Sequence, residues 1–173
     1  MPIRNIWALR PGECLVAEKM MEILNSEVYF PVKDVGTDLL AIRNGRPVRI
    51  QVKESRYYGK GDNAHSWHQL SLKKFKKGFG RVDFYVFLTY LPEIGEHRVS
   101  RFQYVYLVVP YFELNLRLPT KDPGSREIYR FYFHIENDSA SDLRVKTGTD
   151  SDLSDYSSFL NAWHLIDIFL ENE

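Results

Sequence analysis

Apolar residues recur with two different spacings along the chain, and these spacings predict the main elements. At residues 13–25 they return every three or four positions, which indicates an amphipathic helix that begins near Pro11. At residues 46–53 they alternate with polar residues, which is typical of a strand with one buried face. A β-prone run precedes this strand, and Asn44-Gly45 joins the two as a tight hairpin turn.

The remaining elements follow from the same two spacings and from the turn residues between them. Apolar or alternating runs predict further strands at 28–32, 82–90, 102–109 and 128–135. We expect a short basic helix at 70–77, a helical turn or two at 110–118 and a C-terminal helix at 155–171. Polar segments predict loops at 57–68 and 137–154, the second of them exposed. The order of elements indicates one domain of mixed α/β (α+β) class over residues 1–173.

Length and composition are those of a single folded domain. Of the 173 residues 44% are apolar, and no apolar run approaches the ~20 residues that cross a bilayer. Cys14 is the only cysteine, which excludes an internal disulfide and a cysteine-pair zinc site. The first residues lack the charged and apolar regions of a secretory signal, so we expect a cytoplasmic, soluble protein with no membrane partner.

The charges are balanced in number but unevenly placed. Residues 43–81 hold eleven Lys or Arg and two acids, whereas the region after Phe133 holds nine acids and two bases. This asymmetry predicts a basic face that attracts a polyanion such as a nucleic acid. The simpler alternative is that surface charge is patchy by chance.

The hairpin brings three polar side chains to one face of the predicted sheet. A two-residue turn fixes the register, with Leu39 opposite Ile50 as the last apolar pair. The next pair is Asp38 with Gln51, whose Cβ atoms then lie about 4.5–5.5 Å apart. Lys53 lies on the same face because side chains alternate along a strand. A carboxylate, a carboxamide and an ammonium group therefore converge without any long-range contact.

This group of side chains suits hydrolysis of a phosphodiester bond. Mg²⁺ or Mn²⁺ prefers oxygen ligands, which Asp38, Gln51 Oε1 and the Val52 carbonyl offer. A bound ion would acidify a water and stabilise charge on the phosphate. Lys53 would orient or deprotonate that water, or neutralise the developing charge. The alternative is an ion pair of Asp38 with Lys53 or Arg49, which contributes little to stability at a surface.

Gly36-Thr37-Asp38, followed across the hairpin by Gln51-Val52-Lys53, resembles the PD-(D/E)xK nuclease superfamily, nearest to archaeal Holliday junction resolvases. The resemblance covers about half the chain and implies a restriction endonuclease-like core over about residues 12–110. Such a core has a central mixed β-sheet flanked by helices. The resemblance also implies a catalytic acid on the first helix, for which Glu18 is the best match and Glu22 the second.

The sequence departs from the superfamily pattern at one position. Gln51 stands where Asp or Glu is usual, which removes one negative charge from the predicted metal site. Some members of the superfamily also carry Gln there. We therefore expect a site that still resembles a nuclease centre but binds its metal ion more weakly.

Further basic and aromatic residues are candidates for binding nucleic acid. Basic side chains suit contacts to phosphates, with a solvated helix face as the alternative for the last four: Arg49, Arg56, Lys60, Lys73, Lys74, Lys76 and Lys77. Three aromatic residues beyond Lys53 could stack on bases or wedge into a duplex, namely Tyr57, Tyr58 and Trp67, with packing as the alternative for Trp67.

These observations favour a metal-dependent endonuclease that acts on DNA, with RNA as an alternative substrate and a homodimer as an allowed assembly. Two rival hypotheses stay open. One is a nucleic-acid-binding module on the same fold whose metal site is weak or inactive. The other is an interaction protein whose aromatic strands assemble an oligomer.

Overall fold

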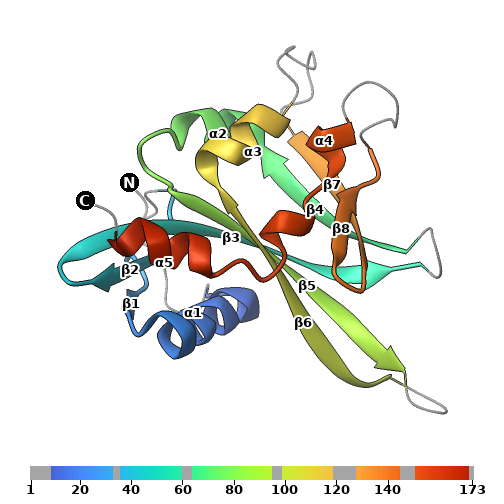
Figure 1. Cartoon of the computed structure of the whole chain (residues 1–173), viewed down its shortest axis with the longest axis horizontal. Coiled ribbons are helices and arrows are strands. Elements are labelled where there is room, and N and C mark those ends of the chain that lie inside the picture. Colours follow the sequence, from blue (N-terminus) through green and yellow to red (C-terminus); the bar gives the residue numbers. More distant parts are fainter. Residues whose placement is uncertain are drawn as a thin grey trace.

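The computed structural model describes residues 9–32, 36–59, 64–94, 99–118, 128–144 and 151–171 (Figure 1). The strands are, in chain order, β1 (Glu27–Tyr29), β2 (Leu39–Arg43), β3 (Arg46–Tyr58), β4 (His65–Ser71), β5 (Phe84–Ile94), β6 (Val99–Pro110), β7 (Ile128–Glu136) and β8 (Ser139–Asp142). The helices are α1 (Pro11–Leu24), α2 (Leu72–Lys77), α3 (Tyr111–Arg117), α4 (Ser151–Ser154), η3 (Ser157–Phe159) and α5 (His164–Glu171). None of the helices in this part of the chain has the length and apolar character needed to cross a membrane.

The long strand β3 is the centre of the sheet. It pairs antiparallel with β2, parallel with β5, and antiparallel with β4 at its last two residues. The sheet continues from β2 to β1, from β5 to β6, and from β4 to β7 and β8. The described strands thus form one eight-stranded mixed sheet with helices on its faces. The predicted mixed α+β fold with a central mixed sheet is confirmed.

Two apolar cores lie on opposite faces of the β3–β5–β6 layer. Helices α1 and α5 cover one face, where they pack against Ile50 and Val86 (Figure 1). On the other face, α2, α3, β4 and β7 enclose a core rich in aromatic rings. Phe87 lies at its centre, with ring centroids 5.1 Å from Phe131 and 5.3 Å from Phe133. The layer is therefore buried on both sides, which fixes the position of β3.

The β2–β3 hairpin has the predicted register. Leu39 lies opposite Ile50, and the Asp38 N–H donates to the Ile50 carbonyl at 2.9 Å, one step beyond β2. Asn44 and Gly45 have φ angles of 54° and 79°, the left-handed conformations that a two-residue hairpin turn requires. The local turn signal was therefore sufficient to place Asp38 beside Gln51.

The predicted loop at 57–68 is wrong. β3 continues to Tyr58, and β4 begins at His65. The sequence of β4 looks like a loop because two of its inward residues are polar. Ser66 and His68 are both buried, and His68 Nε2 lies 3.3 Å from Thr89 Oγ1. A strand whose buried face carries polar side chains lacks the apolar alternation that marks strands in a sequence.

Two predictions near the C-terminus also need correction. The predicted exposed loop at 137–154 contains β8, in which the buried Asp142 carboxylate accepts the Tyr132 N–H at 3.1 Å. The predicted helix at 155–171 consists of η3, a linking segment and α5. Asn161 interrupts it with a φ of 50°, and its side chain accepts the Tyr106 N–H at 3.2 Å. A tertiary contact therefore replaces the helical bonds in this segment.

Candidate active site

The candidate site lies at a gap in the pairing of β3. β2 pairs with β3 only as far as Ile50, and β4 pairs with it at Tyr57 and Tyr58. Among the strands that the structure describes, residues 51–56 pair with β5 alone, so one edge of β3 is open there. The Val52 N–H points to this edge and donates to Asp38 Oδ2 at 2.9 Å. Because a strand directs both backbone groups of a residue to the same edge, the Val52 carbonyl also points into the gap.

The structure brings Asp38, Gln51 and Lys53 together at the gap. Gln51 Nε2 donates a hydrogen bond to the same Asp38 oxygen that accepts the Val52 N–H. Lys53 follows two residues later on the same face and is half-buried. The Asp38 carboxylate acts electrostatically on the Lys53 ammonium group. The convergence expected from the hairpin register is therefore present.

Lys53 lies in a mixed electrostatic environment. Burial lowers the pKa of its ammonium group from the ordinary value of 10.5, and this is the largest influence on it. The charges of Arg10 and Lys74 lower the pKa further, whereas the carboxylates of Asp38 and Glu13 raise it. The Lys53 ammonium group therefore loses its proton more readily than that of an exposed lysine, a property that suits proton transfer.

The α1 carboxylate at this site is Glu13. It is 5% exposed, and its Oε2 lies 3.4 Å from the Arg10 N–H, which it accepts. The start of α1 is held against β3 because the Gly12 N–H donates to Glu54 Oε2 at 2.9 Å. A Cβ atom on Gly12 would lie 2.6 Å from that oxygen, so a larger residue here would require the Glu54 side chain to move. The Glu13 carboxylate acts electrostatically on the Lys53 ammonium group, so this end of α1 lies close to the site.

Glu18, the helix acid expected from the resemblance, lies elsewhere on α1. It is exposed and lines a hollow together with Glu22, Tyr104 and Tyr106. Burial first, and then the charges of Tyr104 and Glu18, raise the pKa of the Tyr106 hydroxyl to about 12. Sequence reasoning passed over Glu13 because it looked like a helix-capping acid. The glycine directly before it was the available signal for a close approach to another element.

The basic candidates have different surroundings. Arg49 Nε and Nη2 donate to the two oxygens of Asp83 at 2.9 and 2.7 Å, which ties β3 to the start of β5. The predicted phosphate contact of Arg49 would thus have to compete with this ion pair. Four exposed lysines lie on α2, namely Lys73, Lys74, Lys76 and Lys77. Lys74 is the one whose charge acts on Lys53, and Lys60 lies outside the described residues.

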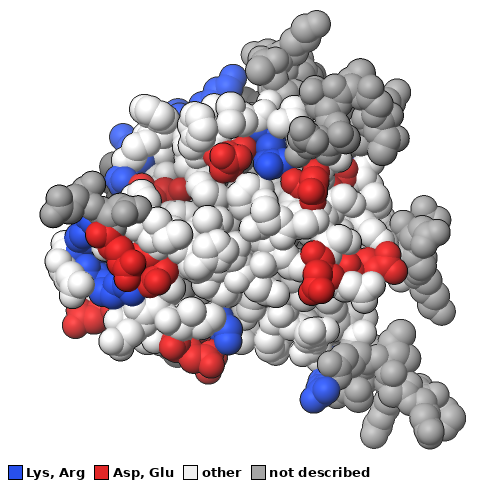
Figure 2. Space-filling view, viewed as in Figure 1, with Lys and Arg blue, Asp and Glu red and all other residues white. Residues whose placement is uncertain are grey.

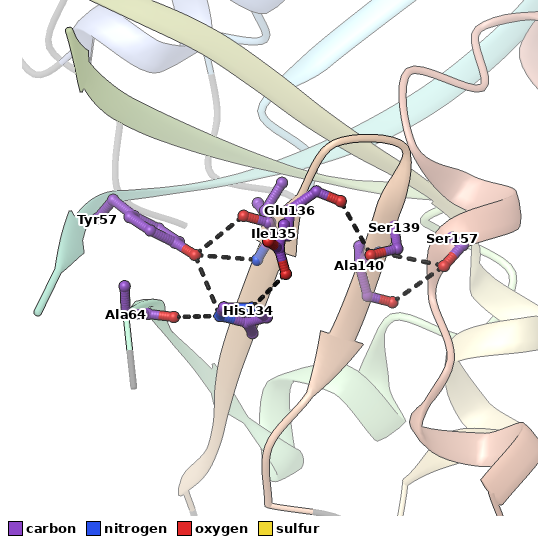
Figure 3. Close-up of polar contacts among 8 residues, drawn as sticks. All are labelled: Tyr57, Ala64, His134, Ile135, Glu136, Ser139, Ala140 and Ser157. Atoms are coloured by element: carbon purple, nitrogen blue, oxygen red, sulfur yellow. Dashed lines mark hydrogen bonds and ion pairs between the residues drawn. The ribbon is translucent and has the colours of Figure 1, made fainter. Parts of the chain in front are cut away.

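Tyr57 is part of a connection between β3 and β7 (Figure 3). Its hydroxyl donates to the Ile135 carbonyl at 3.0 Å and accepts the Ile135 N–H at 3.1 Å. The ring packs against the aromatic core. Arg56 and Tyr58 are exposed and alternate with Tyr57, so they lie on the opposite face of the strand. The structure thus leaves Arg56 and Tyr58 accessible and gives Tyr57 structural contacts.

Replacing Tyr57 by phenylalanine is expected to lower the free energy of unfolding by about 1–2 kcal/mol, because both backbone groups of Ile135 lose their partner. DNA affinity should stay unchanged. Urea denaturation and a DNA titration measure the two quantities, and Tyr58→Phe, at an exposed site, serves as the matched control. Weaker DNA binding at unchanged stability would instead place Tyr57 in a nucleic-acid interface.

The donor atoms at the gap fit a hard divalent cation. The carboxylates of Asp38 and Glu13, the Gln51 carboxamide and the Val52 carbonyl offer oxygen, which Mg²⁺ and Mn²⁺ prefer. In the described part of the chain, no three or more His, Cys, Asp or Glu side chains are grouped so that they could hold a metal ion. A small number of protein ligands is usual for Mg²⁺, which keeps several waters. Gln51 would have to present Oε1 in place of Nε2.

One comparison with known proteins bears on the fold. The chain is similar to a solved structure of a bacterial homing endonuclease, I-Ssp6803I, with a TM-score of 0.50 and 13% sequence identity. The alignment covers 91% of this chain and 89% of that chain. No protein-family model and no curated protein matches the chain. At this identity the likeness shows a shared fold.

Proposed function

We propose that the chain is an Mg²⁺- or Mn²⁺-dependent endonuclease of the PD-(D/E)xK type that hydrolyses phosphodiester bonds of DNA. The observation that carries this proposal is the convergence of Asp38, Gln51, Lys53 and the Val52 carbonyl at the open edge of β3. Glu13 adds a buried carboxylate from a second element. The similarity in fold to an endonuclease agrees with this function.

Each group has a role that follows from its position. Asp38, the Val52 carbonyl and Gln51 Oε1 would hold the ion, after the Gln51 carboxamide has turned away from its hydrogen bond to Asp38. The ion, when bound, supplies positive charge that activates a water and stabilises the phosphate. Neutral Lys53 would accept a proton from the attacking water, and the lowered pKa of its ammonium group raises the fraction of this neutral form. The Glu13 carboxylate partly offsets the positive charges of Arg10 and Lys74 around Lys53.

The exposed lysines of α2 supply the binding surface for DNA. One short helix carries all four of them, namely Lys73, Lys74, Lys76 and Lys77. The charge of Lys74 lowers the pKa of Lys53, so this helix lies near the candidate site. Contacts to phosphates provide most of the affinity of non-specific binding. The basic face predicted from the sequence would therefore deliver the DNA backbone to the gap in β3.

The test is cleavage of supercoiled plasmid DNA with Mg²⁺, with Mn²⁺ and with EDTA. We expect nicking that depends on the divalent ion and falls by about 100-fold in Lys53→Ala. Lys19→Ala, at a lysine that pairs with Glu22 on α1, is the matched control and should cleave normally. DNA binding without cleavage under any metal condition would refute the enzyme and support the binding module.

Replacing Gln51 by glutamate should strengthen metal binding at the cost of stability without metal. The new carboxylate would lie against Asp38, where Gln51 now donates a hydrogen bond, so two negative charges would repel each other. We expect a lower melting temperature in EDTA and a larger rise with Mn²⁺ than in the native protein. Thermal unfolding at several Mn²⁺ concentrations measures both effects. An identical Mn²⁺ response in both proteins would argue against metal binding at Gln51.

A further inference from the structure

Phe79 has an unusual position for a large apolar side chain. It is 79% exposed, the largest fraction among the big hydrophobic residues that the structure describes. It lies in the turn Gly78-Phe79-Gly80-Arg81 between α2 and β5. A single exposed apolar residue is ordinary on a protein surface. The anchoring of this turn, its position and its surrounding charge nevertheless point to a function.

The turn that carries Phe79 is held by hydrogen bonds. The Gly78 N–H donates to the Phe75 carbonyl at 2.8 Å, and the Val82 N–H donates to the Gly78 carbonyl at 3.0 Å. Gly80 has a φ of 68°, which favours glycine. The Phe79 ring meets the Tyr111 ring edge-on at 6.1 Å between centroids. Phe79 therefore projects from a turn that backbone hydrogen bonds hold in place.

Two hydrogen bonds tie this turn to the candidate active site. Thr37 Oγ1 donates to the Arg81 carbonyl at 2.8 Å, and Thr37 directly precedes Asp38. The Arg49 Nη1 donates to the Gly80 carbonyl. Both partners belong to the hairpin that carries the site, so Phe79 keeps a fixed relation to Asp38. Anything that Phe79 touches is thereby placed relative to the gap in β3.

The surroundings of Phe79 are strongly basic. Residues 71–82 contain five Lys or Arg and no acid, and the five are exposed: Lys73, Lys74, Lys76, Lys77 and Arg81. Figure 2 shows Lys and Arg atoms along the upper left of the molecule, where α2 lies in Figure 1. Asp83, the next acid in the chain, pairs with Arg49. Exposed positive charge before and after an apolar side chain in the chain favours a nucleic acid over an apolar protein partner.

We propose that Phe79 is a wedge that enters the base stack of duplex DNA next to the bond that is cleaved. The inference rests on the proposed function and adds a mode of substrate binding to it. The basic side chains hold the phosphates on both sides, and the ring separates two neighbouring base pairs from the minor groove. The resulting kink opens the backbone toward Asp38. The substrate is accordingly duplex DNA at a deformable base step.

The test measures unwinding of DNA, since insertion between base pairs untwists the duplex. A closed circular plasmid is relaxed by a type I topoisomerase while the Lys53→Ala protein is bound, and the linking number is read after the protein is removed. We expect a decrease in linking number that grows with the amount of bound protein. Phe79→Ala in the same background should lose most of this decrease at equal occupancy. Phe79→Leu should keep part of it.

The matched control is Phe112→Ala, at a phenylalanine on α3 that is 66% exposed, which should leave the decrease unchanged. A full decrease with Phe79→Ala overturns the wedge, whereas metal-dependent nicking by the native protein, measured separately, would still support the proposed function. An absence of DNA binding by every variant overturns both proposals. It would leave Phe79 as a contact for an apolar protein partner.

Discussion

Replacing Asp38 by asparagine is expected to lower the rate of Mg²⁺-dependent DNA cleavage by at least about 1,000-fold. The change removes the one anionic member of the proposed ligand set, since the other two proposed ligands, Gln51 Oε1 and the Val52 carbonyl, are neutral. The fold should hold, because Asn can still accept the Val52 N–H that Asp38 accepts at 2.9 Å. Single-turnover plasmid nicking measures the rate, and urea denaturation checks the stability.

The matched control for this substitution is Asp138→Asn, at an exposed aspartate in the turn between β7 and β8. It removes the same charge far along the chain from the hairpin and should cleave at the native rate. Mn²⁺ should raise the melting temperature of the native protein and of the Asp138 variant, and leave that of the Asp38 variant unchanged. Cleavage by Asp38→Asn at the native rate would remove Asp38 from the proposed mechanism.

The part of the site that the sequence predicts well is the part fixed by local geometry. Asn44-Gly45 determines the turn, the turn determines the register, and the register places Asp38 beside Gln51. Each step involves neighbours in the chain or cross-strand partners, so no tertiary contact is needed. The alternation of β3 then places Lys53 on the same face as Gln51.

The parts that the sequence misses depend on contacts between distant elements. Glu13 reaches the site because Gly12 packs against Glu54, 42 residues later in the chain. Arg49 was a candidate for phosphate binding, but Asp83, 34 residues later, holds it in an ion pair. A pattern of residue types cannot distinguish such pairs from solvated side chains, since both look polar in the sequence.

His68 illustrates the same limit and carries a separate consequence for stability. In the sequence it is one of several polar residues in a predicted loop, yet it is 1% exposed and its ring packs edge-on against Phe87 at 5.3 Å between centroids. Burial first, and the charge of Lys53 second, lower the pKa of its imidazole from 6.5 to about 3. His68 therefore stays neutral beside the lysine of the candidate site.

This pKa shift predicts a loss of stability in mild acid. Above pH 6.5 the imidazole is neutral in the folded and the unfolded chain and contributes no pH dependence. As the pH falls below 6.5, His68 binds a proton in the unfolded chain, whereas in the folded chain it stays neutral until about pH 3. The free energy of unfolding should therefore drop by about 2–3 kcal/mol between pH 7 and roughly pH 4.5 through this group.

Substituting His68 by glutamine should remove this drop, because the glutamine amide can still reach Thr89 Oγ1 but does not titrate. Asp142 contributes with the opposite sign, since burial raises the pKa of its carboxyl group and favours the protonated form in the folded chain. Comparing urea denaturation of the native protein and the His68 variant at both pH values cancels that contribution. His65→Gln, on the same strand, is the control and should follow the native curve. If the free energy of unfolding changes with pH in the same way in the native protein and in His68→Gln, His68 titrates normally. The description of His68 as a buried, neutral imidazole beside Lys53 would then be wrong.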